Sequence, residues 1–160
     1  MHDIFNRIRE KQRDDKGFTL IELLVVVVII GVLVAIAVPV YLNYRKGAAD
    51  KSAQSDVRGA ISAIEQFYTE NGNTYPTGPL TLQSASFTLT VSTTAKVTLS
   101  DKTTMVYVLA SAQSYRVCAY NTGGSKVYRY DSLAGGSVNE AASPAITPPL
   151  TAANCTAATP

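Results

Sequence analysis

The feature that most constrains this chain is an uncharged apolar run from Leu23 to Leu42, near the start of its 160 residues. A run of about 20 apolar residues is long enough to cross the hydrocarbon core of a bilayer as a helix. Glu22 stands directly before the run and carries a carboxylate into it. Burying such a charge costs on the order of 2.5–3.5 kcal/mol, so an isolated acid here is expected to have a partner. The run therefore predicts a membrane-spanning helix, and Glu22 predicts a functional contact.

Residues 17–22, which lead into this run, read Gly-Phe-Thr-Leu-Ile-Glu. Together with the run they resemble the class III signal sequence of the type IV pilin superfamily, which includes pilins, type II secretion pseudopilins and competence pseudopilins. The resemblance implies that a prepilin peptidase cuts between Gly17 and Phe18 and methylates the new amino group of Phe18. That amino group is the expected partner of Glu22 on an adjacent copy of the chain.

The resemblance also implies a fold and a set of partners. The fold class is α+β: one long N-terminal helix, with an apolar half in the membrane and an amphipathic half on a small antiparallel sheet, and a disulfide-closed C-terminal loop. The expected segments are a cleaved leader (1–17), an assembly half of the helix (18–42), an amphipathic half (43–71) and an external domain with its tail (72–160). Expected partners are further copies in a helical filament, minor pilins, the prepilin peptidase and, indirectly, an assembly platform and its ATPase. No cofactor is expected.

Two plainer interpretations of the N-terminus compete with this one. Ala35-Ile36-Ala37 fits an ordinary secretory signal that is cut after Ala37, and the apolar run also fits an uncleaved single-pass anchor. Against the ordinary signal, the apolar region from 18 to 34 exceeds the usual length of about 7–15 residues. It also contains Glu22, and the helical pattern continues past the supposed cut.

The distribution of charged residues indicates the membrane topology and argues against nucleic-acid binding driven by bulk charge. Five of the 14 basic residues lie in 1–17, on one side of the apolar run, and the positive-inside tendency keeps that end cytoplasmic. The chain after Leu42 is then outside, in an extracellular pilus or a periplasmic or cell-wall pseudopilus. Beyond residue 17 the basic and acidic residues nearly balance, so bulk charge does not indicate nucleic-acid binding.

Catalytic and metal-binding patterns are weak in this sequence. The one histidine, His2, lies in the leader, so the processed chain could form neither a histidine triad nor a histidine zinc site. The external acids Asp101, Asp131 and Glu140 are scattered, and the chain is predicted not to be an enzyme. Asp131 with nearby backbone oxygens is a candidate calcium ligand, but no EF-hand spacing surrounds it.

Past the apolar run, the helical pattern becomes amphipathic. Apolar or small residues recur at intervals of three and four, which predicts one buried helix face: Ala49, Ala53, Val57, Ala60, Ile61, Ile64, Phe67 and Tyr68. Polar residues are expected on the opposite face: Asp50, Lys51, Gln54, Ser55, Arg58, Ser62, Glu65 and Gln66. A helix from Phe18 to about Glu70 would be roughly 80 Å long. It should end at Asn71-Gly72-Asn73, with Pro76 preventing its continuation.

Gly31 and Pro39 interrupt the apolar half of this helix. A glycine costs about 1 kcal/mol relative to alanine, and a proline removes one backbone hydrogen bond. The ordinary interpretation is that both residues are common in transmembrane helices. The resemblance implies instead that the stretch from Gly31 to Pro39 loses helical order in an assembled fibre.

The rest of the chain has a period of two with many Thr, Val and Tyr residues, which predicts three to five antiparallel strands packed on the helix. The expected strands are Phe87–Val91, Val97–Leu99, Met105–Leu109, Tyr115–Tyr120 and Val127–Tyr130. The tail from Ser132 to Pro160 is rich in Ala, Thr, Pro and Ser and is predicted to be a surface loop. Asn154-Cys155-Thr156 has a glycosylation pattern, which we discount.

Cys118 and Cys155 are the only cysteines, and both lie on the external side, where disulfides persist. A structural disulfide is expected, with two free thiols as the alternative. It would be worth roughly 4 kcal/mol in the chain-entropy model. Such a loop resembles the disulfide-bounded C-terminal region of pilins, whereas major type II pseudopilins more often rely on calcium.

The leading functional prediction is a pilin of a type IV pilus-like filament that serves adhesion, motility or DNA uptake. A pseudopilin is the alternative within the superfamily, and a non-polymerising membrane-anchored binding module is the alternative outside it. Glu22 favours polymerisation, because a simple tether gains nothing from a buried acid. One further hypothesis is a DNA-contacting or adhesive surface. It would use Arg116, Lys126, Arg129, Tyr115, Tyr128 and Tyr130.

Overall fold

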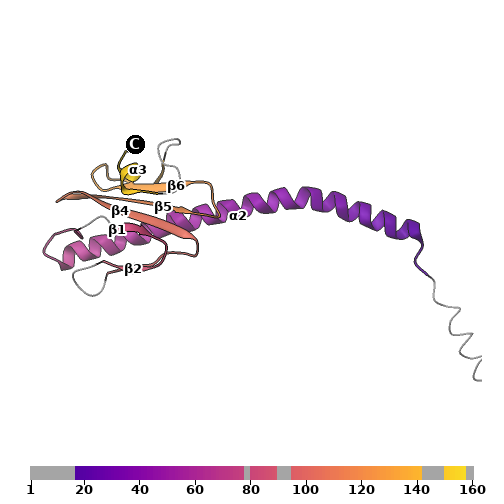
Figure 1. The fold of residues 1–160 in the computed structure, drawn as a ribbon, viewed down its shortest axis with the longest axis horizontal. Helices are drawn as coiled ribbons and strands as arrows, with labels where there is room; N and C mark the ends of the chain where they lie inside the picture. The colour runs from indigo at the N-terminus through magenta and orange to yellow at the C-terminus, as the bar shows by residue number, and fades with distance from the viewer. Residues whose placement is uncertain (1–16, 78–79, 90–94, 142–149, 158–160) are drawn as a thin grey trace, which may run out of the picture. The chain divides into compact units, whose positions relative to one another are not determined.

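The computed structural model describes residues 17–77, 80–89, 95–141 and 150–157 (Figure 1). Residues 1–16 of the expected leader, Val91 of an expected strand and parts of the tail lie outside the described residues. The chain divides into two compact units, residues 1–41 and 42–160, and each is considered by itself.

One long helix, α2, runs from Leu20 to Glu70, and it contains both Gly31 and Pro39. The predicted end of the helix is confirmed. Gly72 and Asn73 have φ values of 63° and 60°, in the left-handed region that favours glycine and asparagine. The backbone and side-chain amides of Asn71 both donate to the carbonyl of Phe67, at 2.9 and 2.8 Å, and so satisfy a carbonyl of the last turn.

The sheet of the second unit is antiparallel and has the strand order β1-β4-β5-β6-β7. Its strands are β1 (Leu80–Gln83), β4 (Thr103–Ser111), β5 (Ser114–Asn121), β6 (Val127–Asp131) and β7 (Asn139–Glu140). A separate ribbon pairs β2 (Phe87–Thr88) with β3 (Lys96–Val97), and a short helix, α3 (Ala152–Ala157), lies near the C-terminus. The predicted α+β class is therefore confirmed.

One face of this sheet packs on the amphipathic part of α2, as the helical pattern predicts. Alternate residues of the central strands, such as Met105, Tyr107 and Val117, join Val57 and Ile64 of the helix in one core. The register of β4 and β5 explains why these residues face α2: Met105 lies opposite Ala119 and Tyr107 lies opposite Val117, all on the same face. All of these residues are at most 1 % exposed.

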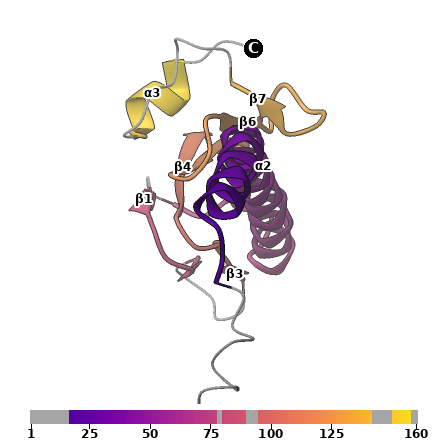
Figure 2. The same cartoon turned by 90° about the vertical axis from the view of Figure 1, so that its right-hand side faces the viewer.

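The other face of the sheet is covered as well, which the sequence pattern does not predict. Val106, Cys118 and Val127 point to this side and pack with Leu150 and Cys155 in a second apolar cluster. Figure 2 shows α3 on the outer side of the sheet, away from α2. The prediction of a surface loop for the whole tail is therefore wrong. Part of the tail forms β7 and α3, because the sheet's second face is apolar and needs a cover.

Two acids of α2 are buried rather than exposed. Asp50 accepts hydrogen bonds from the backbone amides of Ser125 and Lys126, at 2.8 and 2.9 Å. A Cβ at Gly124 would overlap the Asp50 carboxylate, so this turn needs a glycine. Asp56 similarly accepts bonds from the amide and hydroxyl of Ser100, at 2.8 and 2.9 Å. The prediction that Asp50 lies on the outer face is wrong, because loop amides stabilise a carboxylate at that position.

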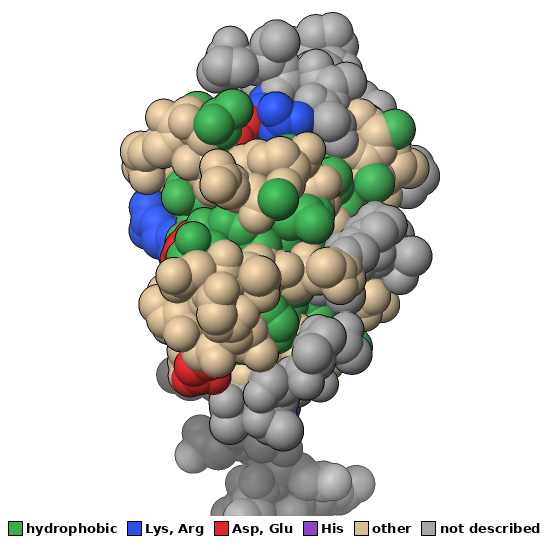
Figure 3. Space-filling view, turned by 90° about the vertical axis from the view of Figure 1, so that its left-hand side faces the viewer, with side chains coloured by type: hydrophobic (Ala, Val, Ile, Leu, Met, Phe, Trp, Pro, Cys, Tyr) green, Lys and Arg blue, Asp and Glu red, His purple; other side chains and the backbone are tan. Residues whose placement is uncertain are grey.

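A chain of tyrosine rings lies where α2 ends. The ring centroids are 4.4 Å apart for Tyr68 and Tyr75, 4.9 Å for Tyr75 and Tyr115, and 5.8 Å for Tyr115 with both Tyr107 and Tyr130. Three of these pairs are tilted and the Tyr107–Tyr115 pair is stacked, and both arrangements add to the stabilisation from burial alone. Figure 3 views the molecule from this end and shows hydrophobic side chains gathered in its middle.

Candidate assembly site

The start of α2 is organised by Thr19 and Glu22. The Thr19 amide and hydroxyl both donate to Glu22 Oε2, at 2.9 and 2.8 Å, and the Glu22 amide donates to the Thr19 hydroxyl at 3.3 Å. This is a capping box, in which an N-cap threonine and the glutamate three residues later satisfy each other's free amides. The carboxylate is thereby held beside the first turn of the helix.

The capping box engages only one of the two carboxylate oxygens. Both bonds end on Oε2, and within the described residues Oε1 of Glu22 accepts no hydrogen bond. A carboxylate can accept about four hydrogen bonds, so Oε1 has full capacity for another donor. The arrangement suits a cationic partner, which can approach Oε1 without breaking the cap.

Apolar side chains surround this carboxylate. A shallow depression of about 430 Å³ is lined by Phe18, Ile21, Glu22, Val25 and Val26. These positions are three or four residues apart, and they therefore share one side of the helix. Phe18 itself is 79 % exposed. The start of α2 thus presents an exposed apolar surface that carries a single charged side chain.

The apolar run continues this exposed surface along the rest of the first unit. Its large side chains range from 47 % exposed at Val26 to 63 % exposed at Leu24 and Ile36. A monomeric soluble protein rarely exposes a contiguous apolar surface of this length. By length and composition, α2 is able to cross a membrane. The surface is therefore suited to lipid or to other apolar helices.

Within the described residues, no contact explains the glycine at position 31. A Cβ at Gly31 would meet nothing within 4 Å, so no neighbouring group in this unit requires a glycine there. Pro39 lies inside the continuous helix, where it removes a backbone donor.

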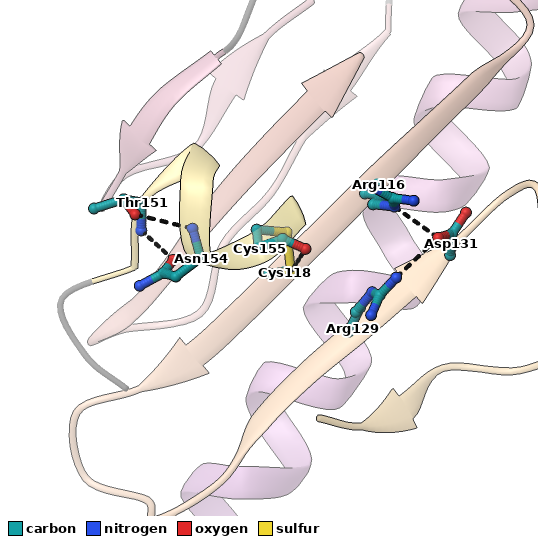
Figure 4. The surroundings of a disulfide bond; sticks show 7 residues. All are labelled: Arg116, Cys118, Arg129, Asp131, Thr151, Asn154 and Cys155. Carbon is teal, nitrogen blue, oxygen red and sulfur yellow. Dashed lines mark hydrogen bonds and ion pairs between the residues drawn. A yellow bond between two sulfur atoms is a disulfide. The ribbon is translucent and has the colours of Figure 1, made fainter. Parts of the chain in front are cut away.

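The predicted disulfide is present between Cys118 of β5 and Cys155 of α3, with Cα atoms 5.9 Å apart (Figure 4). The short helix α3 has its own capping arrangement: the Thr151 amide donates to Asn154 Oδ1 at 2.7 Å, and the Asn154 amide donates to the Thr151 hydroxyl at 3.2 Å. The disulfide therefore fastens an ordered element, and not a loose tail, to the middle of the sheet.

Asp131, the candidate calcium ligand, already has two cationic partners (Figure 4). Its Oδ2 accepts from Arg116 Nε at 2.6 Å and from Arg129 Nη2 at 2.9 Å. Burial raises the pKa of Asp131, but the hydrogen bonds from Arg116, the Leu133 amide and Arg129 outweigh it, so that the pKa lies below its ordinary value. Among the described residues no group of three His, Cys, Asp or Glu side chains could hold a metal ion.

The hypothetical DNA-contacting or adhesive surface does not exist as predicted. Tyr115 and Tyr128 are buried in the core against α2, at 0 % and 5 % exposed, and cannot stack on bases. Arg129 is also buried, and Lys126 is paired with Glu140 at 2.6 Å. The period-two pattern explains the error, because neighbouring arginines and tyrosines on a strand point to opposite faces.

Thr19 is a functional residue that the sequence reasoning missed, although a signal is present. The spacing Thr-x-x-Glu just before an apolar run is the usual mark of a capping box. That spacing alone is sufficient to predict the Glu22 carboxylate at the first turn of the helix.

Comparison with known proteins agrees with this architecture. The prokaryotic N-terminal methylation motif matches residues 12–38. The chain is 38 % identical over 113 residues to the type IV wide pilus major component PilA4 of Thermus thermophilus, covering 71 % of this chain and 79 % of that protein. It is 42 % identical over 57 residues to the type IV major pilin protein PilE of Neisseria gonorrhoeae, covering 36 % and 34 %. The same identity and length relate it to the fimbrial protein EcpC of Eikenella corrodens.

An exposed apolar helix near the N-terminus, followed by an α+β domain with a disulfide, fits a membrane-anchored pilin. The chain belongs to the type IV pilin family, whose members assemble into pilus filaments.

Proposed function

We propose that this chain is a prepilin that is cut between Gly17 and Phe18 and then polymerises through residues 18–42 into a type IV pilus. The observation that carries the proposal is the exposed apolar helix with the Glu22 carboxylate fixed at its start, where Oε1 accepts no hydrogen bond from the part of the chain that the structure describes. In this account residues 1–17 are the leader, 43–71 attach the helix to the sheet, and 72–160 form the outer part of the fibre.

The cut creates the positive charge that can pair with the negative charge of Glu22. Hydrolysis of the Gly17–Phe18 bond leaves a carboxylate on Gly17 and an ammonium group on Phe18. The peptidase then replaces one proton of this amino group by a methyl group taken from a separate methyl-donor cosubstrate, and the secondary amine keeps its positive charge. The ammonium of an incoming copy donates to Glu22 Oε1 of a copy already in place. Pairing offsets the cost of burying both charges, whereas either charge alone would be strongly unfavourable. The contact also sets the axial register of the new subunit.

The remaining cohesion comes from the apolar surface. Lipid tails are as apolar as these side chains, so close packing between helices must supply the attraction. Gly31 and Pro39 weaken the helix between them, and we propose that this stretch loses helical order in the fibre so that neighbouring helices can pack.

The proposed partners follow from this mechanism. They are other copies of the chain, minor pilins, the prepilin peptidase and, indirectly, the assembly platform with its ATPase. The subunit would wait in the cytoplasmic membrane with its N-terminus inside and would end in an external fibre that serves adhesion, motility or DNA uptake. The Cys118–Cys155 disulfide supports a pilus over a pseudopilus.

The test is the intact mass of the protein in fibres sheared from the host cell surface, together with electron microscopy of those fibres. We expect filaments of this chain beginning at N-methyl-Phe18. Replacing Gly17 by valine should block the cut and leave the full precursor in the membrane. A chain that begins at Met1 or Val38, or that never leaves the dispersed monomeric state, would contradict the proposal.

A further inference from the structure

A surface cleft of about 500 Å³ lies in the second unit, at the end of the apolar run. One wall is the part of α2 that starts at Leu42, and the other is formed by two loops of the sheet domain. Its charged lining consists of Arg45, Lys46 and Lys102, with Asp101 as the one acid. Lys46 and Lys102 outnumber the single carboxylate of this lining, which makes the cleft suitable for an anion.

Lys102 is held in this cleft by a constrained turn. Its φ is 61°, a left-handed conformation that side chains with a Cβ disfavour. Two hydrogen bonds fix the turn: Asn121 Nδ2 donates to the Asp101 carbonyl at 2.8 Å, and the Thr122 amide donates to the Lys102 carbonyl at 3.0 Å. Asn121 is buried and also bonds Ser52 of α2 at 3.2 Å. Strained residues held by their surroundings are concentrated at functional sites.

The cleft lies at the level of lipid headgroups if residues 18–42 span a membrane, as proposed above. Arg45 and Lys46 follow Leu42 by three and four residues, which is about 5–6 Å along a helix. The polar layer of a bilayer is about 5–8 Å thick on each side, so both side chains reach it. Cations on the outer side run against the positive-inside tendency, and a ligand would explain their position.

We propose that this cleft binds the phosphate of an anionic phospholipid in the outer leaflet, before the subunit is assembled. Lys46 and Lys102 donate hydrogen bonds to the phosphate oxygens, and the half-exposed Leu42 contacts the start of the acyl chains. The proposal rests on the membrane-spanning role of residues 18–42, but it does not require polymerisation.

The experiment uses the full processed chain in bilayer nanodiscs of equimolar phosphatidylglycerol and phosphatidylcholine, with native mass spectrometry to identify the retained lipids. We expect phosphatidylglycerol to be retained about 25-fold over phosphatidylcholine, since Lys46 and Lys102 near an anionic surface each contribute about fivefold. The variant Lys46→Gln/Lys102→Asn should bring the ratio close to one. Asparagine at 102 removes the charge and tolerates the left-handed backbone.

The matched control is Lys51→Gln, which removes the same charge from an exposed position of α2 outside the cleft and should leave the ratio unchanged. Lys46→Gln alone leaves the turn of Lys102 intact and should lower the ratio about fivefold. Adding free inorganic phosphate should not displace the lipid, because it lacks the acyl chains.

Several results would overturn the proposal. They are no lipid preference in the wild-type chain, a preference that survives in the double variant, a loss of preference in Lys51→Gln as large as in the double variant, and displacement of the lipid by free phosphate. Loss of fibres in the double variant with an unchanged lipid ratio would also overturn it, and would assign the cleft to a contact with a second copy. Because the assay needs only membrane insertion, a chain that inserts but forms no fibres would contradict the proposed function and leave this test readable.

Discussion

The two halves of α2 belong to one helix but differ in where their apolar surface is buried. In the second half, Val57, Ile64 and Phe67 are at most 3 % exposed and pack against the chain's own sheet. In the first half every large apolar side chain is about half exposed or more. The folded chain therefore buries the apolar surface of the second half of α2. The apolar surface of the first half can be buried only by lipid or by further copies.

The acids of the two halves differ in the same way. Asp50 and Asp56 receive their hydrogen bonds from loops of the chain's own sheet domain. Glu22 receives two bonds on Oε2 from Thr19 and none on Oε1 within the described residues. Folding therefore satisfies these two buried acids of the second half, whereas the acid of the first half has one oxygen that can still accept a hydrogen bond from a partner.

The sharpest test of this comparison replaces one apolar residue in each half. Phe67→Ala should lower the free energy of unfolding of the external unit by about 3–5 kcal/mol, because it leaves a cavity in the core. Leu33→Ala removes a side chain that is 61 % exposed and should leave that stability unchanged while it reduces fibre yield. Urea unfolding of the processed chain in detergent micelles measures the first effect. Equal losses of stability in both variants would remove the distinction between the halves.

Removing the disulfide tests how strongly α3 is attached to the second face of the sheet. The double variant Cys118→Ser/Cys155→Ser should lose roughly 4 kcal/mol of unfolding free energy, since it frees a loop with a sequence separation of 37 residues. Membrane insertion, which depends on the first half, should be unaffected. A loss below about 1 kcal/mol in the same urea titration would show that the α3 cover is held by packing alone.

The buried acid of the second half has a smaller expected effect. Asp50→Ala should cost about 1–3 kcal/mol, because the amides of Ser125 and Lys126 lose their acceptor. The neighbouring exposed residue provides the control, and Lys51→Ala should change stability little. Thermal unfolding of both variants by circular dichroism gives the comparison, and equal midpoints would contradict it.

The smallest effect is a pH dependence confined to the tyrosine cluster. Burial, together with the hydrogen bond to Glu65 at 2.8 Å, raises the pKa of Tyr115 above its ordinary value of 10.0. Above that pH the unfolded chain releases the phenol proton while the folded chain retains it, so stability should fall as pH rises. Tyr115→Phe should flatten the decline between about pH 10 and 11, whereas Tyr44→Phe, at a position 77 % exposed, should not. Parallel slopes for both variants would contradict the assignment to Tyr115.

Much of the fold could be predicted because its signals are local. The helix end follows from the backbone preferences of Gly72 and Asn73. The strand around Tyr107 follows from a continuous apolar run, and the strand around Val117 follows from alternation. The errors concern tertiary contacts. Periodicity places Asp50 outside because it carries no information on the loop amides that bind it. The short strands β1 and β7 and the helix α3 are too brief to produce a pattern.

The candidate site was predictable in composition but not in geometry. The position of Glu22 before the apolar run indicates a partnered acid from the sequence alone. Which carboxylate oxygen accepts the capping bonds, and which stays open, depends on the side-chain geometry at the first turn. The fibre contact itself lies between copies, so no single chain can display it.

The charge on Glu22 is the central point of this account, and Glu22→Gln tests it most directly. The amide retains an oxygen that can accept the capping bonds of Thr19, but it removes the negative charge, so that helix capping and charge pairing are separated. The measurement is the yield of sheared fibres relative to the amount of processed subunit in the membrane, with Thr19→Ser as the control that keeps both the cap and the charge. We expect Glu22→Gln to be cut and inserted normally but to lose at least about tenfold in fibre yield, corresponding to about 1.4 kcal/mol, while Thr19→Ser assembles normally. Wild-type fibre yield from processed Glu22→Gln subunits would contradict the pairing of Phe18 with Glu22.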